Sequence, residues 1–167
     1  MTISIRPAVR EDLPLVAELI RALAEYEKLA HEVRFDAAVL GEKLFGPRPY
    51  AEVVIGELHS TPQGFALFFH NFSTFEGKPG IYLEDLFVRP EARGSGLGKA
   101  LLSHLAHLAV SRDCARLEWS VLDWNEPAIG FYRKLGARLM DEWTVMRLDG
   151  GDLARLGATG ANFAETR

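Results

Sequence analysis

The chain has 167 residues, of which 48% are hydrophobic and 25% are charged, and its formal net charge is −4. This length predicts one domain at residues 1–149, followed by a C-terminal tail at residues 150–167. No apolar run approaches the roughly 20 residues that cross a bilayer, so the protein is not expected to bind a membrane. No cluster of Lys and Arg indicates nucleic-acid binding, so nucleic acid is not an expected partner either. The single cysteine, Cys114, excludes an internal disulfide. The first residues lack the basic flank and apolar core of a secretory signal, so the expected location is cytoplasmic.

The first half of the chain changes from strand to helix and back to strand. Ile3–Pro7 alternates apolar and polar residues up to a proline, which predicts a short strand. Apolar residues three and four apart predict a helix over roughly Glu11–Leu29, and Asp36 is a candidate N-cap for a second helix that ends near Phe45. Beyond it, β-branched and aromatic residues between turn residues predict three further strands, at residues 53–55, 64–69 and 81–88.

The second half begins with a glycine-rich turn that leads into a helix. The later elements are predicted as a strand, a helix and a strand, at residues 117–122, 127–135 and 143–148. The resulting order, β-α-α-β-β-β-α-β-α-β, predicts an α/β (α+β) fold with a mixed, mostly antiparallel sheet of about six or seven strands and about four helices. The β-α-β segment over residues 81–122 predicts one parallel pair of neighbouring strands.

The glycine-rich turn, Arg93-Gly94-Ser95-Gly96-Leu97-Gly98, is the most informative segment for function. Glycine lets the backbone take positive φ and approach a ligand closely, and the first N–H groups of a helix bind phosphate. A Walker A loop would need glycine at Arg93 and Ser or Thr at Ala100. A dinucleotide loop would need glycine at Lys99 or Leu101. The pattern that remains, Arg-x-x-Gly-x-Gly, fits a diphosphate site, and a tight turn that binds nothing is the plain alternative.

A second block, at residues 121–137, reads Val-Leu-Asp-Trp-Asn-Glu-Pro-Ala-Ile-Gly-Phe-Tyr-Arg-Lys-Leu-Gly-Ala. Together the two blocks resemble the acetyl-coenzyme A loop and the later strand and helix of the GCN5-related N-acetyltransferase (GNAT) family. Ile5-Arg6-Pro7-Ala8, Tyr26-Glu27 and Tyr82-Leu83-Glu84-Asp85 add a resemblance to the diamine (spermidine/spermine) and thialysine acetyltransferase branch of that family. The resemblance extends from residue 3 to about residue 148.

The resemblance implies the GNAT fold and acetyl-coenzyme A (acetyl-CoA) as co-substrate. It also implies direct transfer of the acetyl group, in a ternary complex, to a primary amine of a small cationic substrate such as a polyamine, a diamine or a lysine-like amine. A homodimer is expected by the same resemblance, and no metal is expected. Two other functions remain open: acetylation of a peptide or protein amine, and a non-catalytic sensor that binds acyl-CoA.

The resemblance also assigns the cofactor-binding residues. Main-chain N–H groups of residues 94–99 would hold the pyrophosphate, and the strand at 86–88 would pair with the pantetheine arm and polarise the acetyl carbonyl. Arg93 would add positive charge near the phosphates, and the Asn125 side chain would bind the cofactor or cap the following helix. The complete set is Leu86, Phe87, Val88, Arg93, Gly94, Ser95, Gly96, Leu97, Gly98, Lys99, Asn125 and Tyr132.

The catalytic pair implied by the resemblance is Tyr132 and Glu84. The Tyr132 phenol would protonate the departing thiolate, and Glu84 would take a proton from the ammonium group. Asp85 would add negative charge that faces the amine, although two adjacent residues of a regular strand point to opposite faces unless the strand bulges. Tyr26 and Glu27 match acceptor-side positions. The plain alternatives are a half-buried aromatic residue for Tyr132 and a solvated helix end for Tyr26 and Glu27.

Other residues bear on the substrate or on competing chemistry. Phe75 stands near the place where diamine enzymes carry tryptophan, whereas Asp123-Trp124-Asn125 is closer to the thialysine enzymes. His104 and His107 are three residues apart without a third candidate metal ligand, and Cys114 has no partner residues typical of a nucleophile. The sequence therefore predicts acetyl transfer more firmly than it predicts the amine.

Overall fold

The computed structural model describes residues 2–160, which divide into two compact units with the boundary between Trp124 and Asn125. Strands and helices of the first unit are β1 (Ile3–Pro7), α1 (Leu13–Tyr26), α2 (Ala37–Phe45), β2 (Glu52–Leu58), β3 (Thr61–Ser73), β4 (Lys78–Val88), α3 (Leu97–Ser111) and β5 (Leu117–Trp119). The second unit contains α4 (Glu126–Lys134) and α5 (Gly150–Gly160). Short 3-10 helices are η1 (Arg10–Asp12), η2 (Ala30–Glu32) and η3 (Pro90–Ala92).

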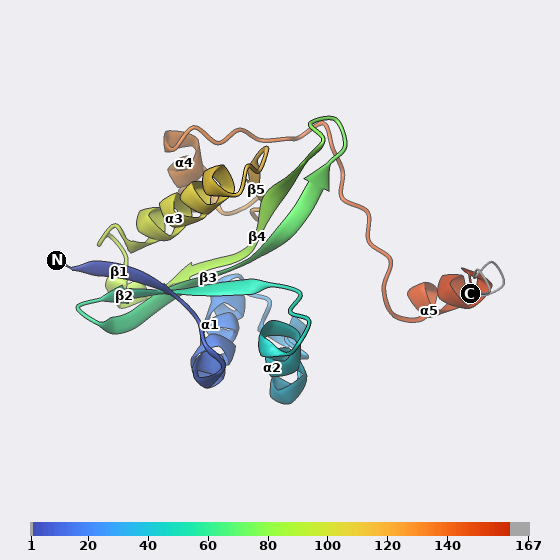
Figure 1. Ribbon diagram of the computed structural model, residues 1–167, viewed down its shortest axis with the longest axis horizontal. Helices are drawn as coiled ribbons and strands as arrows, with labels where there is room; N and C mark the ends of the chain where they lie inside the picture. Colours follow the sequence, from blue (N-terminus) through green and yellow to red (C-terminus); the bar gives the residue numbers. More distant parts are fainter. Residues whose placement is uncertain (1, 161–167) are drawn as a thin grey trace. The chain divides into compact units, whose positions relative to one another are not determined.

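The sheet of the first unit has the strand order β1-β2-β3-β4-β5 (Figure 1). The first four strands are antiparallel neighbours, with Ile5 opposite Gly56 and Ile55 opposite Phe65. β4 and β5 are parallel, with Ile81 opposite Leu117. These pairings confirm the predicted meander and the predicted parallel pair, which is joined by α3 as a crossover helix.

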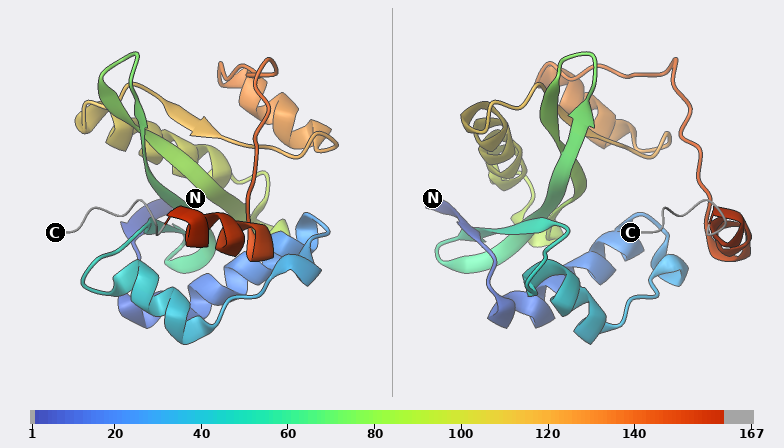
Figure 2. Two further views of the ribbon diagram at one scale, coloured as in Figure 1. Left: turned by 90° about the vertical axis from the view of Figure 1, so that its right-hand side faces the viewer. Right: turned by 45° about the vertical axis from the view of Figure 1, so that its right-hand side comes forward.

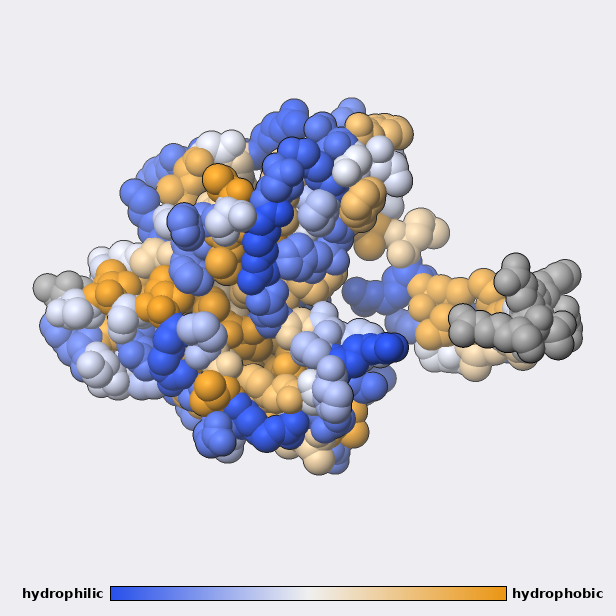
Figure 3. Space-filling view, in the orientation of Figure 1, coloured by the Kyte–Doolittle hydropathy of each residue, from blue (hydrophilic) through white to orange (hydrophobic). Residues whose placement is uncertain are grey.

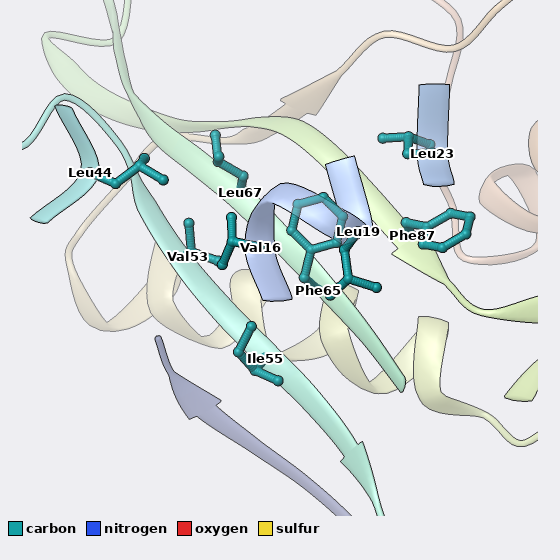
Figure 4. Close-up of a cluster of buried hydrophobic side chains, with 9 residues drawn as sticks. All are labelled: Val16, Leu19, Leu23, Leu44, Val53, Ile55, Phe65, Leu67 and Phe87. Atoms are coloured by element: carbon teal, nitrogen blue, oxygen red, sulfur yellow. The ribbon is translucent and has the colours of Figure 1, made fainter. Parts of the chain in front are cut away.

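Helices cover both faces of this sheet, with α1 and α2 on one face and α3 on the other (Figure 2). The core on the α1 face is a cluster of nine buried residues (Figure 4): Val16, Leu19, Leu23, Leu44, Val53, Ile55, Phe65, Leu67 and Phe87. On the α3 face, Leu97, Leu101 and Leu105 are almost fully buried. Gly56 of β2 allows α3 to approach closely, because a Cβ at that position would lie 2.9 Å from Leu97 Cδ1.

Local signals in the sequence explain where the helices begin and end. The Asp36 side chain accepts a hydrogen bond from the Val39 N–H at 3.0 Å, so it is the N-cap of α2, as predicted. α1 is shorter than the predicted helix over residues 11–29, because Lys28 takes φ +61° and so ends the helix after Tyr26. Because α1 ends early, residues 27–35 belong to the segment that connects α1 with α2.

The prediction of six or seven strands is wrong for the described residues, which contain five, and they contain five α-helices where about four were expected. Residues 143–148 form no strand, and β5 ends at Trp119 where the prediction extended to residue 122. A strand needs a neighbour for its backbone hydrogen bonds, and an alternating apolar pattern does not supply one. The predicted tail contains α5, which begins at Gly150. The domain boundary after residue 149 stays a prediction.

Candidate active site

A β-bulge in β4 decides where two acidic side chains lie. Leu67 of β3 pairs with Asp85, and the next β3 residue, Phe68, pairs with Leu83, so Glu84 is an extra residue without a partner in the ladder. A bulge of this kind interrupts the alternation of side chains between the two faces of a sheet. Glu84 and Asp85 consequently both line the same pocket, which is the condition that a regular strand could not satisfy.

The pocket has a volume of about 430 Å³ and is open to solvent. Its walls come from the C-terminal half of α1, the connecting segment after it, and the bulge of β4. Glu27, which directly follows α1, lines it together with Glu84 and Asp85 of β4 and with Glu32, so four carboxylates line one space. The remaining lining residues are Ile20, Leu23, Ala24, Leu29, Val33, Arg34 and Phe35.

Burial and mutual repulsion change the acidity of this cluster. Burial, with smaller contributions from the charges of Glu84 and Glu27, raises the pKa of Asp85 to about 7. Burial and the nearby charge of Glu84 also raise the pKa of Glu27 above its ordinary value. Repulsion between the carboxylates of the pocket is therefore unfavourable, and a bound cation would reduce it. Asp85 gains or loses its proton near neutral pH.

The glycine-rich turn after β4 has the backbone geometry that its sequence predicts. Gly94 has φ +78° and Gly96 has φ +90°, both in the left-handed region that favours glycine. α3 begins directly after Gly96, so the N–H groups of its first turn, which have no acceptor within the helix, point out of its start. The side chain of Leu97 is buried in the core, and its backbone N–H donates a hydrogen bond to Ser95 Oγ at 3.3 Å.

The end of β4 has an edge that no other strand covers in the described part of the chain. β5 pairs with β4 only from Ile81 to Leu83, whereas β4 continues through residues 84–88. On their other edge these residues pair with β3, as in the opposition of Phe65 and Phe87. The free edge carries backbone donors and acceptors that an extended ligand could join as an added strand. Residues 86–88 thus offer an open strand edge, and the glycine-rich turn leads into a helix start; their roles in binding a cofactor stay predictions.

Arg93 connects the glycine-rich turn with the end of α1. Its guanidinium lies 4.6 Å from the ring centre of Tyr26 and 5.9 Å from that of Phe87, within the range of cation–π attraction. Arg93 Nε also donates a hydrogen bond to the Val88 carbonyl at 3.2 Å. Tyr26 in turn lies near Trp124, with ring centres 6.4 Å apart. The structure thus brings Tyr26 to the glycine-rich turn, a contact that no spacing in the sequence predicted.

The second unit carries the other two predicted site residues. Asn125 is buried and caps α4, because its side-chain oxygen accepts a hydrogen bond from the Ala128 N–H at 3.4 Å. Tyr132 lies one helical turn beyond Ile129 on α4, is partly buried, and has its ring 5.4 Å from that of Phe131. The helix-capping role of Asn125 is confirmed, and the cofactor role of both residues stays a prediction.

Sequence reasoning assigned no role to the segment at residues 29–35, which forms one side of the pocket. Glu32 and Arg34 belong to it, and among the described residues Arg34 is the only Lys or Arg that lines the pocket. The available signal was two charged residues in a linker between amphipathic helices, which is too common to indicate a site. Among residues 2–160, no group of three or more His, Cys, Asp or Glu side chains is arranged to hold a metal ion. No helix in this range is both long enough and apolar enough to cross a bilayer.

Comparison with known proteins agrees with this geometry. The profile of the Acetyltransferase (GNAT) family matches residues 16–137. A thialysine N-epsilon-acetyltransferase of Bos taurus is 35% identical over 165 residues, which cover 92% of this chain and 96% of that protein. An L-ornithine N5-acetyltransferase of Arabidopsis thaliana is 31% identical, with 89% of this chain and 85% of that protein covered. An integron cassette protein of V. cholerae has a TM-score of 0.78 at 28% identity, with 94% and 98% of the two chains covered. The chain therefore belongs to the GNAT family and is an N-acetyltransferase.

Proposed function

We propose that this N-acetyltransferase moves the acetyl group of acetyl-CoA directly to a primary amine of a small cationic substrate. The observation that carries the proposal is the convergence of Glu27, Glu84 and Asp85 on one open pocket. Carboxylates at this density favour a cation. Glu84 and Asp85 lie on β4, whose free edge leads to the glycine-rich turn. The names of two relatives, which specify thialysine and L-ornithine, support a lysine-like or diamine-like amine.

The residues at the end of β4 fit acetyl-CoA. N–H groups of residues 94–99 would bind the diphosphate, and residues 86–88 would pair with the pantetheine arm and orient it along the sheet. When bound, the co-substrate supplies a thioester, which is the acetyl donor. Pairing along β4 would bring the acetyl end toward the bulge, next to the acidic pocket, so that proximity supplies much of the catalysis.

Asp85 is the stronger of the two adjacent candidates for accepting the proton of the ammonium group. An amine attacks only after it loses this proton, and a base works best when its pKa is close to the working pH. The pKa of Asp85 is about 7, and its side chain is more buried than that of Glu84. The resemblance assigned this role to Glu84. We propose that Asp85 accepts the proton and that Glu84 and Glu27 hold the cation.

We propose Tyr132, which α4 carries, as the general acid of the reaction. Its match to the general-acid tyrosine of the family supports a role in protonating the departing thiolate. Phenol and thiol have similar ordinary pKa values, so this proton transfer is not steeply uphill. Asn125 would fix the start of the helix that carries Tyr132, since it is the N-cap of α4.

We also propose that the protein is a homodimer. The segment after α4 exposes a run of large apolar side chains, with Trp143, Val145 and Met146 at 75%, 84% and 88% exposure. Leu153 and Leu156 of α5 are also exposed, and Figure 3 shows apolar surface on this helix. Exposed apolar side chains that gather into a surface patch are typical of an interface between proteins.

The direct test of the function is release of free thiol from acetyl-CoA in the presence of spermidine, putrescine, L-lysine, thialysine or a short peptide. We expect turnover with one or more of the small amines. Tyr132→Phe should lower kcat by on the order of 10²-fold because the general acid is lost, and Tyr50→Phe, which changes an exposed tyrosine, should not. Turnover with the peptide alone would favour protein acetylation, and binding of acetyl-CoA without any turnover would favour the sensor.

Gly96→Val tests the diphosphate site. Valine is strained at φ +90°, so the turn should shift and the affinity for CoA in calorimetry should fall by about 10-fold or more. Gly77→Val is the matched control, because Gly77 has φ +64° in the β3–β4 turn and a Cβ there meets no neighbour. The control should lose stability while retaining CoA affinity. Equal CoA affinity in both variants would contradict the assignment of the turn.

The pKa of Asp85 predicts a pH dependence. Below about pH 7 the carboxyl group is protonated, so it neither attracts the ammonium group nor accepts its proton, and kcat/KM for the amine should fall. Asp85→Asn should lower kcat/KM by about 10²-fold at pH 7 and recover in part above pH 9, where more amine is neutral. Rates measured from pH 5 to 10 check this.

Two variants complete the pH experiment. Glu25→Gln changes an exposed acid of α1 outside the pocket and should keep the profile of the unaltered protein. Glu84→Gln should weaken amine binding while retaining the pH-dependent limb. If Glu84→Gln removes that limb and Asp85→Asn retains it, the proton goes to Glu84, as the resemblance implied.

The dimer is tested by sedimentation velocity of the full chain. We expect two copies per particle at micromolar concentration, and the double change Trp143→Ser and Val145→Ser should yield single chains because it removes the apolar surface. Val110→Ser, at an exposed position of α3, is the control and should leave the dimer intact. A particle of one chain for the unaltered protein would refute the proposal.

A further inference from the structure

We propose that Arg93 makes the enzyme selective for acetyl donors that carry a diphosphate. Its side chain lies at the edge of β4 where the pantetheine arm of a donor would pair, so the arm has to displace it. A donor with a diphosphate gives the displaced guanidinium a new partner, whereas a pantetheine thioester without a diphosphate does not. This inference rests on the proposed placement of acetyl-CoA along β4.

The Val88 carbonyl points to the uncovered edge of β4. In an antiparallel pair of strands, residues alternate between those that bond to the neighbouring strand and those whose N–H and C=O groups point away from it. The Arg89 N–H donates a hydrogen bond to the Gln63 carbonyl at 2.8 Å, and the next pair along the ladder is Val88 with Gly64. Val88 is therefore of the second kind, and its carbonyl faces the side where a strand or an extended ligand would be added.

The Arg93 side chain lies on this same side of β4. Its Nε donates a hydrogen bond to the Val88 carbonyl at 3.2 Å. An added strand would lie about 4.8 Å from β4 and would approach the same carbonyl from the same direction. The guanidinium and a pantetheine arm therefore compete for one place at the edge.

Two aromatic rings stabilise Arg93 in this position. The guanidinium lies 4.6 Å from the ring centre of Tyr26 and 5.9 Å from that of Phe87, and a cation at these distances is attracted to a ring. Phe87 belongs to the buried core, so its ring is held in place. Moving Arg93 away from the edge would break a hydrogen bond and both ring contacts, which opposes binding of the pantetheine arm.

A diphosphate at the glycine-rich turn would offset this cost. Arg93 directly precedes Gly94, the first residue of the turn with positive φ, so rotation of its side chain can bring the guanidinium to a ligand bound there. Hydrogen bonds between a guanidinium and phosphate oxygens are roughly twice as strong as neutral ones. Selectivity can come from a penalty on the wrong ligand as well as from attraction to the right one. Arg93 would supply both, since it opposes the arm at Val88 and attracts the diphosphate.

Equilibrium binding of CoA and pantetheine tests this role without requiring turnover. The two ligands carry the same thiol arm, and only CoA carries a diphosphate. Each is titrated into the full-length protein and followed by NMR, which measures weak binding. In Arg93→Met, pantetheine should bind about 5-fold more tightly, because no hydrogen bond to Val88 has to be broken. CoA should bind about 3-fold more weakly, because the lost charge pair with the diphosphate outweighs that gain. High salt should reduce only the effect on CoA.

Two further variants complete this experiment. Tyr26→Leu removes one of the two rings and keeps the charge of Arg93, so it should tighten pantetheine binding without weakening CoA binding. Arg48→Met is the matched control, because Arg48 is an exposed arginine in the segment between α2 and β2, and it should change neither affinity.

Unchanged or weaker pantetheine binding in Arg93→Met would overturn the role of Arg93. Tighter pantetheine binding in this variant, without acetylation of any amine by the unaltered protein, would support the role and refute the proposed function. Acetylation of small amines by the unaltered protein, with unchanged pantetheine binding in Arg93→Met, would do the reverse.

Discussion

The candidate site depends on one irregularity of the backbone, the bulge at Glu84 in β4. In an unbroken ladder, Glu84 and Asp85 would face opposite sides of the sheet, and one of them would point away from α1. The extra residue lets both line the pocket that α1 also lines through Glu27. The same strand continues past the end of β5 into the glycine-rich turn. One strand therefore supplies the acidic groups, the free backbone edge and the entry to the helix start that suits phosphate.

Crowding these acids has an energetic cost that the rest of the first unit must offset. The pKa of Asp85 is raised because ionisation in this partly buried place is unfavourable, and the charges of Glu84 and Glu27 make it more so. The apolar cluster beneath them, which includes Leu23 and Phe87, holds α1 and β4 together despite this repulsion. A cationic ligand would reduce this repulsion. The arrangement therefore lowers the stability of the unliganded protein and favours binding of a cation.

Local patterns predicted most of the fold. Apolar spacing located α1, Asp36 located the start of α2, and turn residues separated the strands of the meander. The prediction failed at residues 143–148, because alternation of apolar residues describes a surface and does not supply a pairing partner. In the site, motifs identified the glycine-rich turn and the acids of β4. The contact between Arg93 and Tyr26, and the role of residues 29–35 as a wall, are tertiary features that no local spacing encodes.

The uncovered edge of β4 has a consequence for the chain when no ligand is present. Unpaired amide and carbonyl groups along the edge of a strand can pair with the strands of other chains and cause aggregation. Proteins commonly prevent this with charged residues or proline at the edge. Here Glu84 and Asp85 belong to the part of β4 whose edge is uncovered, and Pro90 follows shortly after the end of this strand. Glu84, which we propose holds the substrate, and Asp85, which we propose accepts its proton, would thus also disfavour pairing of this edge with the strands of other chains.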